Sequence, residues 1–125
     1  MTDAVLVIVT CASVEEAGRI AERLVEERLA ACGTALPGAQ SVFRWQGKLC
    51  RESEVVLLLK TRGEFFERLR ARVRALHSYE LPEIIALPLA AGDQQYLEWL
   101  RAETSAPGKS DGTRTGFADD KGEPK

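Results

Sequence analysis

Two stretches of the sequence are apolar without a break, and they constrain the fold more than any other feature. The first is VLVIV at residues 5–9 and the second is VVLLL at residues 55–59. A strand with one buried face alternates apolar and polar residues, whereas an unbroken apolar run of this length is typical of a strand that is buried on both faces. The fold must therefore place a layer on each side of these two strands.

Two amphipathic helices and two further strands are predicted from the rest of the chain. Ser13 and Glu16 match a capping box, which opens a helix of about 18 residues that Gly33 ends. Thr61 and Glu64 are a second match, ahead of a helix that ends near His77. The predicted strands span residues 5–10, 41–45, 55–60 and 83–89, with a turn at residues 37–38, a hairpin tip at residues 46–48 and a last short helix capped by Asp93.

The order of these elements is that of the ferredoxin-like fold, βαββαβ, in the α+β class. We expect a four-stranded antiparallel sheet with both long helices on one face, the first and third strands in the centre, and a short helix at the C-terminus. This domain spans residues 1–104. Residues 105–125 are polar, with Phe117 as their one aromatic residue. They are predicted to be a flexible tail because they offer too little apolar area to offset the entropy of ordering.

The second face of the sheet is the part that this fold leaves uncovered. Two helices can shield only one face, so the apolar side chains on the other face need a further cover. The last strand shows the same need: Pro88 belongs at a sheet edge, yet residues 84–87 are all apolar, and an open apolar edge invites aggregation. A second copy of the chain is the simplest cover. The alternative is that the last helix and the tail cover these surfaces within one chain.

The composition of the whole chain excludes some classes of protein. A net charge of −2 argues against nucleic-acid binding, whose usual footprint is a basic excess. The apolar run at residues 4–9 lacks a basic flank and is too short to span a bilayer, so neither a signal peptide nor a membrane anchor is expected. The three cysteines are odd in number and show no CxxC spacing, which favours reduced thiols in the cytosol over disulfides.

His77 is the only histidine of the chain, and two roles fit it. At the end of a helix it faces the negative end of the helix dipole and merely closes the helix. As a metal ligand it needs a soft partner, which only a cysteine can supply. Cys11 follows the first strand, in a loop that could reach a cleft. Cys32, at the end of the first helix, reads more simply as a buried structural thiol, and Cys50, near the hairpin, is expected to be exposed.

A pocket between subunits is a second hypothesis for the site. Trp45 with Lys48 on the hairpin, and Tyr79 with Glu80, can line it, and Lys60 is a further predicted pocket residue. The alternative for Trp45 is a packing role on the hairpin. Neither a glycine-rich phosphate loop nor an activated nucleophile can be recognised, so no catalytic residues are predicted.

Several stretches together resemble one family. EERLAAC closes the first helix, PGAQSVFRWQGKL forms the hairpin, LLLKT ends the third strand, and LHSYELPEIIALPLAAGDQQYLEWL covers the rest. Over residues 4–101 the sequence resembles the divalent-cation tolerance family CutA. The resemblance implies a compact homotrimer, tolerance of copper and other divalent cations, a likeness to the trimeric PII signalling proteins, and no established enzymatic activity.

Two departures from the family pattern bear on metal binding. The usual His-Pro-Tyr motif is His-Ser-Tyr at residues 77–79, and the thiol and the second histidine that some relatives carry fall at Val9 and Leu76. We therefore expect copper or another divalent cation to bind weakly. The predicted ligands are His77, Cys11 and Cys32.

The leading hypothesis is a cytosolic homotrimer that binds a divalent metal or a small ligand weakly at clefts between subunits and has an unidentified protein or small-molecule partner. One rival is an acylphosphatase-like hydrolase on the same fold, although residues 10–13 offer no glycine or arginine for a phosphate cradle. The other rival is a structural or adaptor trimer whose clefts bind nothing.

Overall fold

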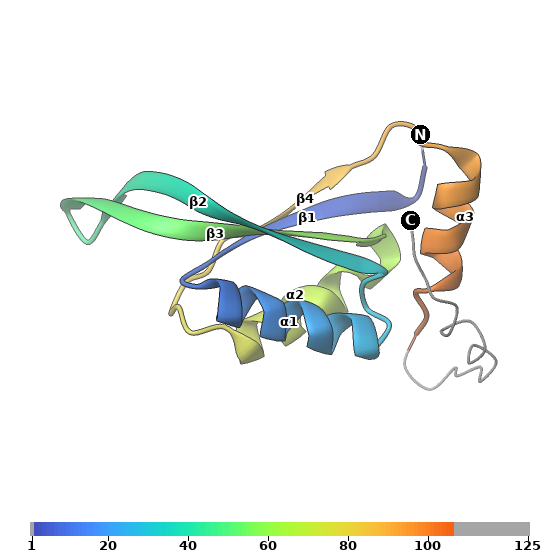
Figure 1. Ribbon diagram of the computed structural model, residues 1–125, viewed down its shortest axis with the longest axis horizontal. Helices are drawn as coiled ribbons and strands as arrows, with labels where there is room; N and C mark the ends of the chain where they lie inside the picture. The colour runs from blue at the N-terminus through green and yellow to red at the C-terminus, as the bar shows by residue number, and fades with distance from the viewer. Residues whose placement is uncertain (1, 107–125) are drawn as a thin grey trace.

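The computed structural model describes residues 2–106 of the chain (Figure 1). Its elements in chain order are β1 (Ala4–Cys11), α1 (Val14–Glu26), β2 (Cys32–Trp45), β3 (Lys48–Arg62), the 3-10 turn η1 (Gly63–Phe65), α2 (Phe66–Leu76), β4 (Ile84–Pro88) and α3 (Gln94–Ala102). The predicted tail lies outside the described residues from residue 107 onward.

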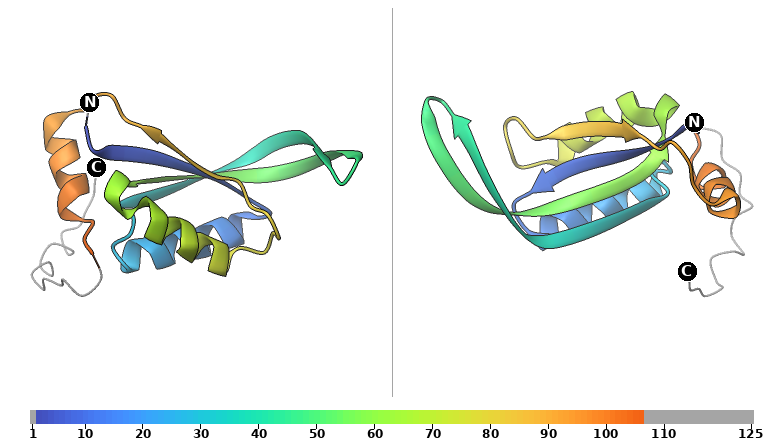
Figure 2. Two further views of the ribbon diagram at one scale, coloured as in Figure 1. Left: turned by 180° about the vertical axis from the view of Figure 1, so that it is seen from behind. Right: turned by 90° about the horizontal axis from the view of Figure 1, so that it is seen from above.

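The four strands form one antiparallel sheet in the order β2-β3-β1-β4. β1 and β3 are central and β2 and β4 are the edges, as the sequence predicts, and Pro88 ends β4 at an edge. α1 and α2 lie side by side on one face of the sheet, whereas α3 stands at the end where β1 begins (Figures 1 and 2). The predicted ferredoxin-like α+β fold is confirmed.

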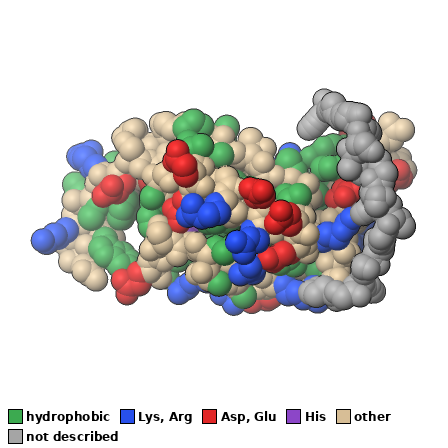
Figure 3. Space-filling model, turned by 60° about the horizontal axis from the view of Figure 1, so that its bottom comes forward, with side chains coloured by type: hydrophobic (Ala, Val, Ile, Leu, Met, Phe, Trp, Pro, Cys, Tyr) green, Lys and Arg blue, Asp and Glu red, His purple; other side chains and the backbone are tan. Residues whose placement is uncertain are grey.

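Alternate residues of the central strands build the core beneath the helices. Val7 and Val9 of β1 have no exposed surface, and neither have Leu57 and Leu59 of β3. They pack against the buried side chains of the two helices, Ala17, Ile20, Leu24, Leu69 and Val73. The outer side of the helix layer is polar: Figure 3 shows acidic and basic side chains mixed across it.

The intervening residues face the other side of the sheet, which α3 covers at one end only. There Leu100 packs on Ala4 and Ala31. Elsewhere the apolar side chains on this side are partly or largely exposed, with Leu36, Ile85 and Leu87 exposed by 47%, 50% and 47%. We call this surface the open face, and it consists of Leu6, Ile8, Leu36, Val56, Leu58, Ile85 and Leu87. Among the described residues, α3 therefore covers only one end of this side of the sheet, and the rest of the open face is left exposed.

α1 is shorter than the sequence predicts. It ends at Glu26, and Arg28 follows with a positive φ of 62°. Cys32 and Gly33 belong to the start of β2 and not to the helix. Gly33 serves close packing, because a Cβ added there would lie 2.7 Å from the Cβ of Ala21 in α1. The predicted helix end was wrong because a packing glycine was taken for a helix terminator.

Two of the three predicted helix caps are present. At α1 the Ser13 hydroxyl accepts a hydrogen bond from the Glu16 amide at 3.1 Å. At α3 the Asp93 carboxylate accepts one from the Tyr96 amide at 3.0 Å. Each side chain satisfies an amide that has no partner inside its helix.

The third predicted cap, Thr61, is wrong. Thr61 lies in β3 opposite Val5, is fully buried, and its hydroxyl has no hydrogen-bond partner among the described residues. β1 offers pairing partners as far as Ala4, so β3 continues to Arg62. α2 therefore begins only after η1, at Phe66.

β2 and β3 form a long hairpin that projects beyond the body of the molecule (Figure 1). Its tip is where the sequence predicts it: Gln46 and Gly47 have φ values of 52° and 83°, the left-handed pair that a tight hairpin turn needs. Pro37 and Gly38, predicted as a turn, instead mark a register shift within β2, between Leu36 and Ala39. Such a bulge bends the hairpin without ending the strand.

Candidate functional site

Three segments meet where β1 ends, and each contributes one potential metal ligand. Cys11 is the last residue of β1, Glu16 lies in the first turn of α1, and His77 follows α2. The thiol sulfur, a carboxylate oxygen and a ring nitrogen of these residues lie within 4.8 Å of one another. We call this group the buried cluster. It unites two of the predicted metal ligands and adds Glu16, which the sequence assigned to helix capping alone.

Both ring nitrogens of His77 are engaged. Nδ1 lies 3.0 Å from the Tyr79 amide and accepts its hydrogen bond. Nε2 must then carry the proton, which it donates to the Thr10 carbonyl at 2.8 Å. The ring is fully buried, and the backbone amide of His77 also bonds to Val73, which closes α2. His77 therefore ends the helix as predicted, and it also ties the loop that follows the helix to β1.

Glu16 joins the same two loops through its carboxylate. Oε1 accepts from the Ala12 amide at 3.1 Å and Oε2 accepts from the Ser78 amide at 2.7 Å. Burial acts to raise the pKa of Glu16, but these amide hydrogen bonds, together with His77, outweigh burial and hold the pKa below its ordinary value. A capping-box glutamate usually bonds to the amide of its own cap residue. Here it bonds to the amides of two neighbouring loops. The capping-box pattern therefore identified Glu16 as a structural residue but did not indicate these partners.

Cys11 is in the core and not in a loop as predicted. It has no exposed surface. Burial, reinforced by the charges of Glu16 and Glu54, raises the pKa of its thiol to about 12. The thiol is therefore protonated at neutral pH, whereas a metal requires the thiolate.

The buried cluster fits a metal by residue type but not by its present contacts. Thiolate and imidazole suit copper and zinc. However, the histidine nitrogens and the carboxylate oxygens are already hydrogen-bonded within the protein. A metal ion would have to break these bonds and remove the thiol proton. The arrangement as it stands stabilises the junction of three segments.

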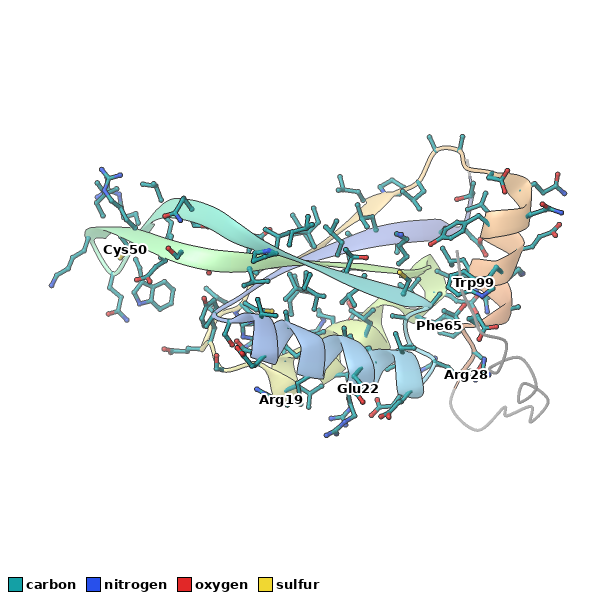
Figure 4. All side chains as sticks on the ribbon, viewed as in Figure 1. Arg19, Glu22, Arg28, Cys50, Phe65 and Trp99 are labelled. Atoms are coloured by element: carbon teal, nitrogen blue, oxygen red, sulfur yellow. The ribbon has the colours of Figure 1, made fainter. Side chains whose placement is uncertain are left out.

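A cleft of about 480 Å³ lies between the hairpin and the loop after His77. It brings together three of the residues predicted for a ligand pocket, Trp45, Tyr79 and Glu80, whereas Lys48 and Lys60 are not part of its lining. The other residues of its lining are Ala12, Phe43, Cys50, Glu52, Ser53, Glu54 and Leu81. Figure 4 shows Cys50 at the hairpin end of the molecule, far from Trp99 of α3. Cys50 is half-buried in this cleft, so it is less exposed than predicted.

A hydrogen bond between Tyr79 and Glu54 connects the cleft to the buried cluster. The Tyr79 hydroxyl donates to Oε2 of Glu54 at 2.7 Å, and the Tyr79 ring lies 4.7 Å from that of His77. Burial raises the pKa of Tyr79, and the bond to the Glu54 carboxylate raises it further. Glu54 itself is only 8% exposed. A buried carboxylate is costly to keep unless a partner satisfies it.

Hairpin periodicity is the sequence signal that could have identified the rest of the cleft. Phe43 pairs with Cys50 and Trp45 pairs with Lys48 across the hairpin, so these side chains share one face with Glu52. Val42 and Leu49 point to the other face and are 57% and 60% exposed. One face of the hairpin thus lines the cleft and the other presents apolar side chains outward.

Lys60 and Cys32 lie away from both the cleft and the buried cluster. The Lys60 ammonium is 3.2 Å from the Tyr96 hydroxyl and 4.0 Å from the Cys32 sulfur, next to α3. Lys60 pairs with Leu6, five residues before Cys11 in β1, which is roughly 17 Å along a strand. Cys32 is half-buried in β2 and is not the helix-end thiol that the sequence suggests.

Among residues 2–106, no helix has both the length and the apolar character needed to cross a membrane.

Comparison with known proteins identifies the family to which the chain belongs. The family model described as "CutA1 divalent ion tolerance protein" matches residues 5–103. The divalent-cation tolerance protein CutA of Thermus thermophilus is 50% identical over 99 residues, 79% of this chain and 96% of that protein. The solved structure from that organism superposes with a TM-score of 0.80 over 82% of this chain and 99% of that chain, at 49% identity.

Two further relatives extend the comparison. CutA from Xylella fastidiosa superposes with a TM-score of 0.81 at 43% identity, over 83% of this chain and 100% of that one. The chloroplastic protein CutA of Arabidopsis thaliana is 43% identical over 100 residues, which are 80% of this chain but only 55% of the plant protein. Because the match extends over most of the chain in sequence and in structure, this chain belongs to the CutA1 family of divalent ion tolerance proteins.

Proposed function

We propose that this chain acts as a cytosolic homotrimer in the tolerance of copper and other divalent cations, with an architecture like that of PII signalling proteins. In this proposal the clefts between subunits bind a small ligand or a divalent cation weakly, and the protein is not a catalyst. The observation that carries it is the acidic and aromatic cleft under the projecting hairpin. The names of the relatives, which refer to tolerance of divalent cations, support the same direction.

The assembly part of the proposal is supported by apolar surface that one chain leaves uncovered. The open face presents side chains such as Ile85 and Leu87, about half of whose surface is exposed. The outer face of the hairpin adds Val42 and Leu49. Contiguous exposed apolar surface of this kind marks an interaction site. A hairpin that contacts a second copy through its outer face would leave its inner face on the cleft, at the boundary between subunits.

The metal part of the proposal concerns the buried cluster. Any ion held by Cys11, Glu16 and His77 would compete with the hydrogen bonds of the folded protein, so we expect weak binding. Cys32, the third predicted ligand, lies beside Lys60 and would not take part without a rearrangement.

Two measurements test the proposed function. Sedimentation velocity at micromolar concentration should show a trimer, and a monomer would contradict the assembly. Competition with a copper(I) chelator should show weak binding, because thiolate and imidazole suit copper but the ion must displace hydrogen bonds of the folded protein. His77→Ala should lower the affinity and Cys11→Ser should lower it further, whereas Cys32→Ser, as a matched control, should leave it unchanged. Equal affinity in all four proteins would remove the buried cluster from the proposal.

The hydrolase alternative has less support. An acylphosphatase-like site needs free amides after β1 to hold an anion. The Ala12 amide already bonds to the Glu16 carboxylate, whose negative charge would repel a phosphate. Assays with a model acylphosphate should show no turnover above the uncatalysed rate.

A further inference from the structure

We propose that the cleft binds an aliphatic amine in its protonated form, with the ammonium group on Glu54 and the carbon chain against Trp45. This inference rests on the proposed function, because it assigns a ligand class to the same cleft.

The charge of the cleft is one-sided. Its lining contains the carboxylates of Glu52, Glu54 and Glu80, and none of its lining residues is basic. Two basic residues adjoin the lining: Lys48 pairs with Trp45 at the hairpin tip, and Arg74 donates to the Glu80 carbonyl at 3.5 Å. Neither forms an ion pair with a carboxylate of the cleft in the described structure. Such a cleft attracts a cation.

The second observation is the burial of Glu54, and it does not depend on how many acidic residues line the cleft. It is 8% exposed, and the one hydrogen bond found for its carboxylate within residues 2–106 comes from the neutral Tyr79 hydroxyl to Oε2. A carboxylate buried to this degree is normally paired with a cation or held by several donors. No hydrogen bond to Oε1 is found within residues 2–106, and this oxygen is not fully enclosed, because Glu54 lines the cleft. An ammonium group in the cleft would supply the missing donor.

The spacing of the carboxylates argues against a metal ion as the occupant. Within residues 2–106, the set of three potential ligand atoms that lie within 4.8 Å of one another is the buried cluster, not the cleft carboxylates. A single divalent metal ion needs its ligands at about 2.0–2.6 Å from itself. Carboxylates dispersed around a cleft of about 480 Å³ suit a longer ligand whose positive groups are separated by carbon atoms.

The aromatic side chains of the cleft offer a surface on which the carbon chain of the ligand can pack. Phe43 and Trp45 are 39% and 38% exposed, and both line the cleft with Tyr79. Aromatic faces attract ammonium groups and also bury methylene groups. A protonated aliphatic amine offers both, whereas a hydrated metal ion offers neither an N–H donor nor apolar surface.

The test measures binding of spermidine by calorimetry at constant ionic strength, with magnesium and tetramethylammonium as comparison cations. We expect saturable binding of spermidine, at least tenfold tighter than that of either comparison cation. Magnesium carries charge without apolar surface, and tetramethylammonium carries apolar surface without an N–H donor. Binding of either one as tight as that of spermidine would overturn the proposal.

Two variants and one control assign the binding to the cleft. Glu54→Gln keeps an acceptor for Tyr79 but removes the charge, and Trp45→Leu removes the aromatic face; each should weaken spermidine binding at least tenfold. Glu22→Gln on the outer side of α1 (Figure 4) should not change it. Should Glu54→Gln unfold the chain, the exposed Glu80→Gln provides the same test with an expected loss of at least threefold. Unchanged affinity in the folded cleft variants would overturn the proposal.

Sedimentation velocity on the same samples separates this inference from the proposed function. A trimer that does not bind spermidine would overturn the amine ligand and leave the assembly intact. A monomer that binds spermidine through Glu54 would support the amine ligand and contradict the assembly.

Discussion

The imidazole of His77 donates to the carbonyl oxygen of Thr10 across 2.8 Å, and so fastens the loop after α2 to the end of β1. The same ring accepts from the Tyr79 amide. Both bonds are shielded from water, because the side chain has no exposed surface. Hydrogen bonds in such a site stabilise modestly when made, but their loss leaves buried groups unpaired.

His77→Ala should therefore destabilise the protein by about 2–4 kcal/mol, since it leaves the Thr10 carbonyl and the Tyr79 amide without partners and opens a void. Urea unfolding followed by circular dichroism measures the change. Leu81→Ala, at a side chain that is 61% exposed, is the matched control and should change stability by less than about 0.5 kcal/mol. A loss below about 1 kcal/mol for His77→Ala would show that the loop is held mainly by other contacts.

Gly33→Ala should destabilise the protein by about 1–3 kcal/mol, because the new methyl group would lie 2.7 Å from the Cβ of Ala21 and force β2 away from α1. Gly18→Ala, in α1 itself, is the control. A Cβ at Gly18 would meet nothing within 4 Å, so this change should stabilise α1 by about 0.5–1 kcal/mol. Thermal unfolding of the two variants should shift in opposite directions, and equal shifts would contradict the packing role of Gly33.

The ion pair between Glu27 and Arg72 predicts a loss of stability in acid. Arg72 bonds to both carboxylate oxygens, at 2.9 Å and 2.9–3.1 Å, and this contact holds the pKa of Glu27 below its ordinary value. A lowered folded pKa means that the stabilisation is complete above the unfolded pKa and is lost as the pH falls through the folded pKa. About a third of each side chain is exposed, so we expect only about 0.5–1 kcal/mol at pH 7.

The measurement is the difference in unfolding free energy between the wild type and Glu27→Gln from pH 7 to pH 2.5. The difference should shrink towards zero as the pH falls through the lowered pKa of Glu27, where the carboxyl becomes protonated in the folded protein. Glu67→Gln, at a carboxylate that is 75% exposed beside Arg70, should show a smaller difference at every pH. A difference for Glu27→Gln that grows as the pH falls would contradict the predicted sign.

Ile85→Asp should dissociate the proposed trimer without unfolding the protomer. Ile85 is half exposed on the open face, so a carboxylate there meets water in the isolated chain but would be buried between copies at a cost of several kcal/mol. Sedimentation velocity together with circular dichroism should show a folded monomer. Glu98→Gln on α3 is the control and should leave the assembly unchanged. A trimer that persists in Ile85→Asp would place the contact between copies elsewhere.

The sheet and its two helices could be predicted from sequence because local patterns determine them. The apolar runs at residues 5–9 and 55–59 require central strands, and Gln46-Gly47 requires a tight turn. The failures arise where tertiary contacts outweigh local preference. Gly33 reads as a helix end but serves packing, and Thr61 reads as a cap but is held in β3 by pairing with Val5.

The candidate site could be predicted only in part, because some of its residues meet through tertiary contacts. His77 and Tyr79 stand together in the sequence, so their importance was visible, but Glu16 and Glu54 become neighbours of these residues only in the folded chain. Lys60 is predicted to share a pocket with Trp45, but Lys60 lies beside Tyr96 of α3, whereas Trp45 lies at the far end of β2 near the hairpin tip. Sequence spacing alone does not give the distance in space between a strand residue and a loop that comes much later in the chain.

The hydrogen bonds around His77 also bear on how the chain folds. They join residues 62 to 67 positions apart, from Glu16 to Ser78 and from Thr10 to His77. Contacts of such long sequence separation require a large loop to close first, so they tend to form after the folding transition state. Replacing His77 should then accelerate unfolding while leaving the refolding rate nearly unchanged. During synthesis on the ribosome, β1 can pair with β3 earlier, but the loop after α2 can be fastened to the end of β1 only after residue 79 has emerged.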